Sequence, residues 1–120
     1  MGRNSELAQP LGVKFDDGKS PVVEGVFNYF PNALKAVAQV SEYGTNKYNV
    51  FFYERSWIKV PNGYSRYTNA LGRHLLDEAI NPVDEESKLL HAQMAAWNAL
   101  ARLEILMQGG PTTTEASIEP

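Results

Sequence analysis

The sequence contains no cysteine among its 120 residues. This absence excludes disulfides, thiolate metal sites and cysteine nucleophiles. No apolar run is long enough to cross a membrane, and nothing at the start resembles a signal peptide. Basic charge is scarce too, because 11 Lys and Arg residues face 14 Asp and Glu residues and leave a net charge of −3. Since polymeric nucleic acid usually binds a basic surface, we expect a cytoplasmic protein whose partner is neither a membrane nor a nucleic-acid polymer.

The residues that are present are typical of a globular protein. Hydrophobic residues make up 43% of the chain and charged residues 21%, a balance that predicts a packed core. The length corresponds to one domain, which we place at residues 12–107. The start of the chain is polar and aperiodic, and its end reads "GGPTTTEASIEP". We therefore expect a flexible N-terminus over residues 1–11 and a disordered tail over residues 108–120.

Hydrophobic periodicity predicts an all-α fold with three helices. They are expected at residues 31–44, 62–79 and about 81–107. Gly44 supplies a left-handed residue that can end the first helix, and Asn62 is a good N-cap for the second. Asn81 and Asp84 offer caps for the third. Between the first two helices, the aromatic segment "NVFFYERSWIKVPNGY" is expected to form a short strand or an ordered loop.

The third helix is apolar on two sides. One face comprises Leu90, Met94, Trp97, Ala101 and Ile105. The roughly opposite face comprises Leu89, Ala96, Leu100, Leu103 and Met107. A helix that is apolar on two sides must be covered on both, and two other helices of so short a chain can barely do this. We therefore expect a homo-oligomer, a dimeric or higher helical bundle built around this helix.

The stretch "RYTNALGRHLL" carries the strongest chemical signal. At helical spacing, its apolar side comprises Tyr67, Leu71 and Leu75, and its polar side comprises Arg66, Asn69 and Arg73. His74 borders the polar side, and His91 and Asn98 lie seven residues apart on the third helix. If the two helices pack side by side, these groups converge, and arginine binds phosphate with two parallel hydrogen bonds. The alternative is a solvated arginine face with two histidines in the core.

Three weaker patterns also allow two interpretations each. The acidic cluster "DEES" could hold Mg²⁺ together with His91, or it could cap a helix. In "KFDDGKSP", Lys19 could meet a phosphate, although a simple turn explains the same residues. Tyr48 and Trp57 could stack on a nucleobase with Lys47 nearby, although aromatic side chains in a small protein often form its core.

Taken together, these motifs resemble a known family. "GVKFDDGK", "FPNAL", "VSEYGTNKYN", "SW", "RYTNALGRHLL", "DEESKLLH" and "AAWNALARLE" follow one another in the order and spacing of the dATP/dGTP diphosphohydrolase N-terminal domain family, which is common in bacteriophages. The likeness covers residues 12–107. It implies a relation to the all-α nucleoside triphosphate pyrophosphohydrolases, which form dimers or tetramers and use helix-borne carboxylates with Mg²⁺ to release pyrophosphate. For a viral protein, the location would be the host cytoplasm.

The resemblance also implies which positions matter. The matching positions are Gly18, Lys19, Gly44, Lys47, Tyr48, Trp57, Arg73, His74, Asp84, Glu86, Ser87, His91, Trp97 and Asn98. The chain departs from the family pattern at Asn69, where members have an acidic or hydroxyl residue, and at Met94, where a second histidine is common. The second helix offers no carboxylate before Asp77, and the third offers only Glu104 after its first turn.

Cationic and amide side chains suit the binding of an anion better than its cleavage. We therefore expect a protein that binds a small-molecule nucleotide, as a non-hydrolysing sponge for a signalling nucleotide. The nucleotide-binding residues would be Lys19, Lys47, Tyr48, Trp57, Arg66, Arg73, His74, His91 and Asn98. Two alternatives remain open: a dNTP pyrophosphohydrolase that uses Mg²⁺ as cofactor, with Asp84 and Glu86 at the metal, and a small helical adaptor without a ligand.

Overall fold

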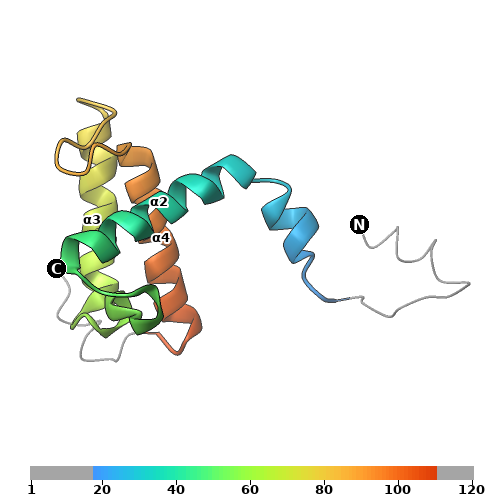
Figure 1. The fold of residues 1–120 in the computed structure, drawn as a ribbon. Coiled ribbons are helices and arrows are strands. Elements are labelled where there is room, and N and C mark those ends of the chain that lie inside the picture. Colours follow the sequence, from blue (N-terminus) through green and yellow to red (C-terminus); the bar gives the residue numbers. More distant parts are fainter. Residues whose placement is uncertain (1–17, 111–120) are drawn as a thin grey trace, which may run out of the picture. The chain divides into compact units, whose positions relative to one another are not determined.

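The computed structural model describes residues 18–110, and within this range the chain is helical and contains no β-strand (Figure 1). This confirms the all-α prediction. The elements are a π-helix η1 (Val23–Phe27), α2 (Pro31–Tyr48), two 3₁₀-helices η2 (Phe52–Glu54) and η3 (Ser56–Lys59), α3 (Gly63–Glu78) and α4 (His91–Met107). None of these helices has the length and apolar character needed to span a membrane.

The chain divides into two compact units, one up to Pro31 and one from Asn32 onward. The helix η1 belongs to the first unit, where its backbone is capped by a hydrogen bond from the Asn28 N–H to the Val23 carbonyl. The groove and the side-chain clusters described below belong to the second unit. The predicted flexible N-terminus, residues 1–11, and residues 111–120 of the predicted tail 108–120 lie outside the described residues.

The first long helix runs further than expected. The prediction that Gly44 ends it was wrong, because α2 continues for another turn to Tyr48. The left-handed residue is Asn49 instead, with φ of 55°, and asparagine is among the few residues that visit this conformation readily. The Val50 N–H then closes the turn on the Thr45 carbonyl at 3.0 Å. The extra turn keeps Lys47 and Tyr48 on the helix.

The second long helix agrees with its prediction to within a residue. Asn62 occupies the N-cap position of α3, but it has φ of 56° and its side chain makes no capping hydrogen bond. Between α2 and α3, the aromatic segment forms η2 and η3 rather than a strand. Arg55 joins these two turns in the left-handed conformation, with φ of 46°.

The predicted start of the third helix was wrong, because α4 begins only at His91. The preceding residues form a loop closed by an antiparallel bridge between Val83 and Leu90. Asn81 Oδ1 accepts a hydrogen bond from the Val83 N–H at 2.9 Å, and Asp84 Oδ2 accepts one from the Ser87 N–H at 2.8 Å. These side chains therefore cap turns of the loop, since short polar side chains compete with helix formation through such local bonds.

Helices α3 and α4 pack against each other in opposite directions, and α2 crosses them (Figure 1). Buried Gln93 links α4 to α2, because its Nε2 donates to the Ala36 carbonyl at 2.7 Å. Trp97 Nε1 makes a second link by donating to Ser41 Oγ at 2.9 Å. These two side chains position α2 over α4.

The two apolar faces of α4 have different environments within one chain. On the first face Ala101 is buried, and Met94 and Trp97 are partly buried. On the second face Leu100 is 47% exposed, Leu103 50% and Met107 75%. Within α4, the single chain thus covers most of the first face and leaves most of the second to solvent, while Leu90, just before the helix, is 48% exposed. The homo-oligomer that was expected to cover both faces stays a prediction.

Candidate functional site

A groove of about 630 Å³ lies among α2, the η2–η3 segment, α3 and α4. This size is within the usual range for small-molecule sites. Four cationic residues line it: Lys47, Arg55, Arg66 and Arg73. No Asp or Glu is among its described lining residues. In a chain with a net charge of −3, this concentration of positive charge favours an anionic ligand.

The groove also has aromatic walls. Tyr48 and Phe51 line it with most of their surface exposed, at 67% and 66%. Trp57 lines it as well, but its ring meets Trp97 edge to face, with centroids 5.9 Å apart. Trp57 therefore belongs to the aromatic core and to the groove at once, whereas Tyr48 and Phe51 offer flat surfaces on which a base could stack.

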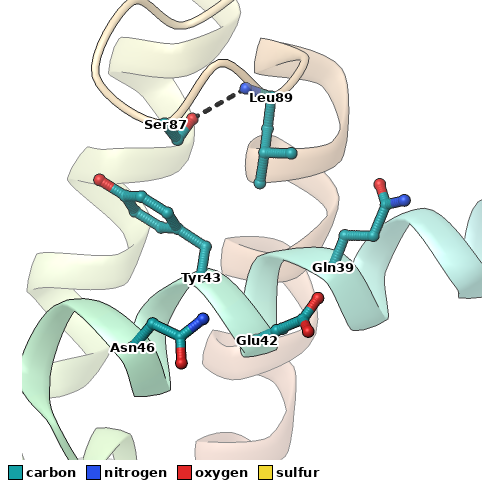
Figure 2. Close-up of a pocket in the computed structure, with 6 residues that line it drawn as sticks. All are labelled: Gln39, Glu42, Tyr43, Asn46, Ser87 and Leu89. Atoms are coloured by element: carbon teal, nitrogen blue, oxygen red, sulfur yellow. Dashed lines mark hydrogen bonds between the residues drawn. The ribbon is translucent and has the colours of Figure 1, made fainter.

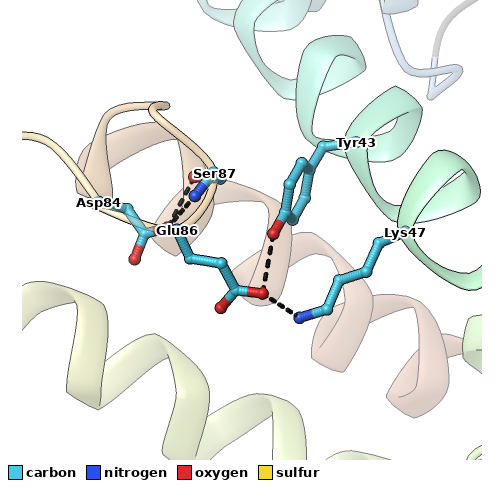
Figure 3. A network of polar contacts seen from close by, with 5 residues as sticks. All are labelled: Tyr43, Lys47, Asp84, Glu86 and Ser87. Atoms are coloured by element: carbon cyan, nitrogen blue, oxygen red, sulfur yellow. Dashed lines mark hydrogen bonds and ion pairs between the residues drawn. The ribbon is translucent and has the colours of Figure 1, made fainter.

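Lys47 is held at the groove by an acidic partner from the loop before α4 (Figure 3). Its Nζ lies 2.7 Å from Glu86 Oε2, and the same oxygen accepts a hydrogen bond from the Tyr43 hydroxyl at 3.0 Å. The hydrogen bonds from Lys47 and Tyr43 lower the pKa of the Glu86 carboxyl, and the bond to Glu86 raises the pKa of Lys47. Lys47 therefore stays charged, but Glu86 offsets part of its attraction for an anion.

The only two histidines of the chain meet beside this groove. His74 of α3 and His91 at the start of α4 lie with their Nδ1 atoms 2.9 Å apart, and His91 is only 6% exposed. One atom from each ring and one carboxylate oxygen of Asp84 all lie within 4.8 Å of one another. Burial lowers the pKa of His74, which favours the neutral imidazole whose lone pair can bind a metal.

Asp84 is oriented by the turn that contains it. Its Oδ2 accepts hydrogen bonds from both the backbone N–H and the hydroxyl of Ser87, at 2.8 and 2.7 Å. Partial burial acts to raise the pKa of Asp84, but the two bonds from Ser87 and the nearby histidines outweigh it and lower the pKa. The carboxylate therefore stays ionised beside the two rings.

A second, smaller hollow of about 240 Å³ lies beside α2 (Figure 2). Its walls comprise Gln39, Glu42, Tyr43, Asn46, Ser87 and Leu89. Ser87 Oγ accepts a hydrogen bond from the Leu89 N–H at 3.1 Å, which shapes the loop at its edge. With one carboxylate and no cation among these residues, the hollow does not suit a phosphate.

The structure brings most of the predicted nucleotide-binding residues together. Lys47, Tyr48, Trp57, Arg66, Arg73 and Asn98 all line the groove. His74 and His91 form the pair beside it. Asn98 is buried, and its Nδ2 donates to the Met94 carbonyl within α4. Lys19 lies in the first unit of the chain and is exposed.

The two predicted metal ligands, Asp84 and Glu86, belong to different clusters of side chains. Asp84 joins the histidine pair, whereas the Glu86 carboxylate binds Lys47 and Tyr43. Sequence reasoning missed Arg55 in the groove, because no helical pattern relates the turn between η2 and η3 to Arg66 and Arg73. Local sequence gives no signal for such a long-range approach.

Arg102 was also missed. Its Nε donates to Thr68 Oγ1 at 2.7 Å, and its guanidinium hydrogen-bonds the Tyr64 hydroxyl. It also lies 4.7 Å from the centre of the Tyr64 ring. These contacts join α4 to α3 and give the Arg102 guanidinium a structural role, because its charge lies over the face of an aromatic ring. Only the packing of the two helices reveals this role.

Comparison with known protein families identifies the family of the chain. The model of a family described as dATP/dGTP diphosphohydrolase, N-terminal, matches residues 11–115. This range contains the whole groove and the histidine pair. A search of curated proteins and a search of solved structures found no significant match.

Proposed function

This chain belongs to the dATP/dGTP diphosphohydrolase N-terminal family, and from that premise we propose that it binds a nucleotide in the groove between α2, α3 and α4. One observation carries the proposal: four cationic side chains and no carboxylate line the groove along the described part of the chain. The phosphates would meet Arg66 and Arg73, which lie two helical turns apart on α3. The base would meet Tyr48, with Trp57 at the inner wall.

Arginine suits this role because its planar fork matches two phosphate oxygens at once. Arg66 and Arg73 are both exposed, yet they face a shared concavity, which distinguishes them from arginines on a convex solvated face. Lys47 adds a point charge from α2, and Arg55 adds one from the η2–η3 turn. A ligand with several phosphate charges would engage all of these elements.

The same lining favours retention of the nucleotide over its cleavage. Hydrolysis of a triphosphate needs a metal that bridges phosphate oxygens and a water activated by metal or base. The described groove residues contain no carboxylate that could supply either. We therefore propose a non-hydrolysing nucleotide-binding protein, a sponge for a signalling nucleotide.

The Mg²⁺-dependent pyrophosphohydrolase is the second candidate, and the cluster of His74, Asp84 and His91 is the observation that favours it. Two of the three donor atoms are imidazole nitrogens, however, whereas Mg²⁺ selects oxygen ligands. Glu86, the other expected carboxylate, is bound to Lys47. These residues therefore do not fit a magnesium site, and we derive no hydrolytic step from them.

A binding experiment tests the proposal. The full chain is incubated with dATP, dGTP and cyclic dinucleotides, with EDTA or with Mg²⁺, and calorimetry measures affinity while chromatography identifies the nucleotide recovered after denaturation. A sponge binds in EDTA and returns its ligand intact. Release of pyrophosphate would establish the hydrolase instead. If the chain neither retains a nucleotide nor hydrolyses one, the helical adaptor without a ligand remains.

The variant Arg73→Ala sharpens this experiment. A hydrogen bond to a charged group contributes about 1.5–3 kcal/mol, so we expect the dissociation constant to rise by roughly 10- to 100-fold. Lys35→Ala removes one positive charge from an exposed position on α2 that does not line the groove. This control should bind as the unmodified chain does, and equal weakening by both variants would contradict a site at the groove.

A further inference from the structure

We propose that His74, Asp84 and His91 form a binding site for a divalent transition-metal ion. The proposal does not depend on the nucleotide, because the ion would bind the free protein. Both histidines of the chain come from different helices and arrive at the same point, with their Nδ1 atoms 2.9 Å apart. A carboxylate oxygen lies within 4.8 Å of both.

The separation of the two nitrogens suits ligands of a common ion. Nitrogens bound at about 2.0–2.1 Å lie roughly 2.9–3.4 Å apart when the angle at the metal is between about 90° and 110°. The observed 2.9 Å lies at one end of this interval. Since no pair among the three ligand atoms exceeds 4.8 Å, small side-chain rotations would place all three on one ion.

The ligands are also supported by their surroundings, as ligands of bound metals usually are. The Ser87 N–H and hydroxyl both donate to Asp84 Oδ2, so the carboxylate is oriented by its own turn. The backbone N–H of His91 donates to the Pro82 carbonyl at 2.9 Å, which ties the start of α4 to the loop containing Asp84. His91 is 6% exposed, and its ring has little freedom to turn toward solvent.

The donor set selects the class of ion. Two imidazoles and one carboxylate suit Mn²⁺, Fe²⁺, Co²⁺, Ni²⁺ or Zn²⁺, whereas a set of oxygens suits Mg²⁺ or Ca²⁺. Three protein ligands leave further positions open for water or for a ligand atom, as in reactive rather than purely structural sites. Two residues that line the groove are neighbours of the histidines in sequence. Arg73 directly precedes His74 on α3, and Met94 lies three residues after His91 on α4. The site therefore borders the groove along both α3 and α4.

The competing explanation is a hydrogen bond between the two rings, with one Nδ1 protonated. Nuclear magnetic resonance separates the two explanations, because only two histidine rings contribute signals in an untagged chain. We expect the signals of both rings to shift together on addition of Zn²⁺, saturating at one ion per chain. Co²⁺ should produce a visible absorption band typical of nitrogen ligation. Mg²⁺ at the same concentration should leave the rings unchanged.

A matched pair of variants tests the carboxylate. Asp84→Asn removes the negative charge with little change of shape, and Glu85→Gln makes the same chemical change one residue later on an exposed side chain. We expect Asp84→Asn to weaken Zn²⁺ binding at least tenfold and Glu85→Gln to leave it unchanged. His74→Gln should abolish the Co²⁺ band.

The proposal is overturned if excess Zn²⁺ leaves both ring signals in place, if Mg²⁺ shifts them equally, or if the two carboxylate variants behave alike. The ring signals of the unmodified chain need no variant, so a folding defect in His74→Gln does not obscure the result. Nucleotide binding in EDTA is measured separately, which means that failure of the metal site and failure of the nucleotide site can be told apart.

Discussion

The Tyr67 side chain joins α3 to the η3 turn and packs within the aromatic core. Its hydroxyl donates to the Trp57 carbonyl at 2.5 Å, and its ring meets Trp57 and Trp97 edge to face. Burial raises the pKa of Tyr67 to about 12, against about 10 for a free tyrosine. As the pH rises, the unfolded chain therefore loses the Tyr67 phenol proton at a lower pH than the folded chain does.

This pKa predicts a loss of stability in alkali. The stabilisation is complete below the unfolded pKa of about 10 and is lost as the pH rises from about 10 to about 12. Tyr67→Phe should flatten this part of the profile and, by removing the hydrogen bond, lower the free energy of unfolding at neutral pH by about 0.5–1.5 kcal/mol. Urea denaturation at several pH values measures both effects. Tyr53→Phe, at a side chain that is 80% exposed, is the control, and an equal effect there would refute the prediction.

The pairing of Lys47 with Glu86 gives a prediction for binding at the scale of one residue. Glu86→Gln removes the charge that holds Lys47, so the cation becomes free to attract an anion in the groove. An exposed ion pair contributes only about 0.2–1 kcal/mol, so we expect nucleotide affinity to rise by at most about fivefold. Calorimetry at low salt measures this change, which should shrink as salt is added.

Glu85→Gln removes the same charge from a neighbouring exposed residue and serves as the control for Glu86→Gln. Weaker binding in Glu86→Gln would show that the pair is needed to shape the groove. The sequence predicted only part of this arrangement, since Lys47 was expected near the base-stacking residues Tyr48 and Trp57. The pairing was not visible, because Glu86 lies 39 residues further along the chain, on a loop whose path depends on the packing of α4.

At the scale of elements, Gln93 holds α2 and α4 together. Its Nε2 donates to Ala36 of α2, and its Oε1 accepts from the Leu90 N–H at 2.9 Å, which caps the start of α4. The residue is 8% exposed, so its loss would leave buried polar groups without partners. A cost of about 1–3 kcal/mol is expected for such a loss.

Gln93→Ala should therefore lower the midpoint of urea unfolding, whereas Gln108→Ala, at the exposed end of the same helix, should not. If both variants unfold at the same urea concentration as the unmodified chain, the link between α2 and α4 is not energetically important. Weaker nucleotide binding by Gln93→Ala is also expected, since α2 supplies Lys47 and Tyr48 to the groove.

Helix positions followed from the sequence more reliably than helix ends. Apolar spacing and Asn62 located α3 to within a residue, because an amphipathic stripe is a local property. The start of α4 was misplaced, because Asn81 and Asp84 satisfy turns of the loop rather than a helix end. Asn81 and Asp84 could cap either a helix end or a turn of a loop. The bridge between Val83 and Leu90 decides for the loop, and it is not visible in the local sequence.

At the scale of the whole molecule, the core is small for the number of apolar side chains. Among residues 18–110 the buried apolar residues are Val40, Ala95 and Ala101. Short chains bury a small share of their surface and often gain stability by association. The exposed stripe of Leu100, Leu103 and Met107 on α4 agrees with the expected homo-oligomer.

We therefore predict that analytical ultracentrifugation will find more than one chain per particle, and that Leu103→Glu will dissociate it. A charge in the centre of an apolar interface has no partner and is costly to bury. Glu78→Lys makes a charge change at an exposed position on a different helix, α3, and should leave the particle intact. A monomer at micromolar concentration in the unmodified chain would contradict the prediction.

The sequence by itself determined the helical fold, the approximate position of each long helix and the family, because these depend on local periodicity and on short motifs in register. It also singled out Arg66 and Arg73 of α3 as candidate phosphate ligands, a role that stays a prediction. Only the tertiary structure decided which groups meet: Arg55 with Arg66 and Arg73 around one groove, and His74 with His91 and Asp84 beside it. The physical reason is that such meetings depend on helix crossings and loop paths, which are set by contacts between residues far apart in the chain.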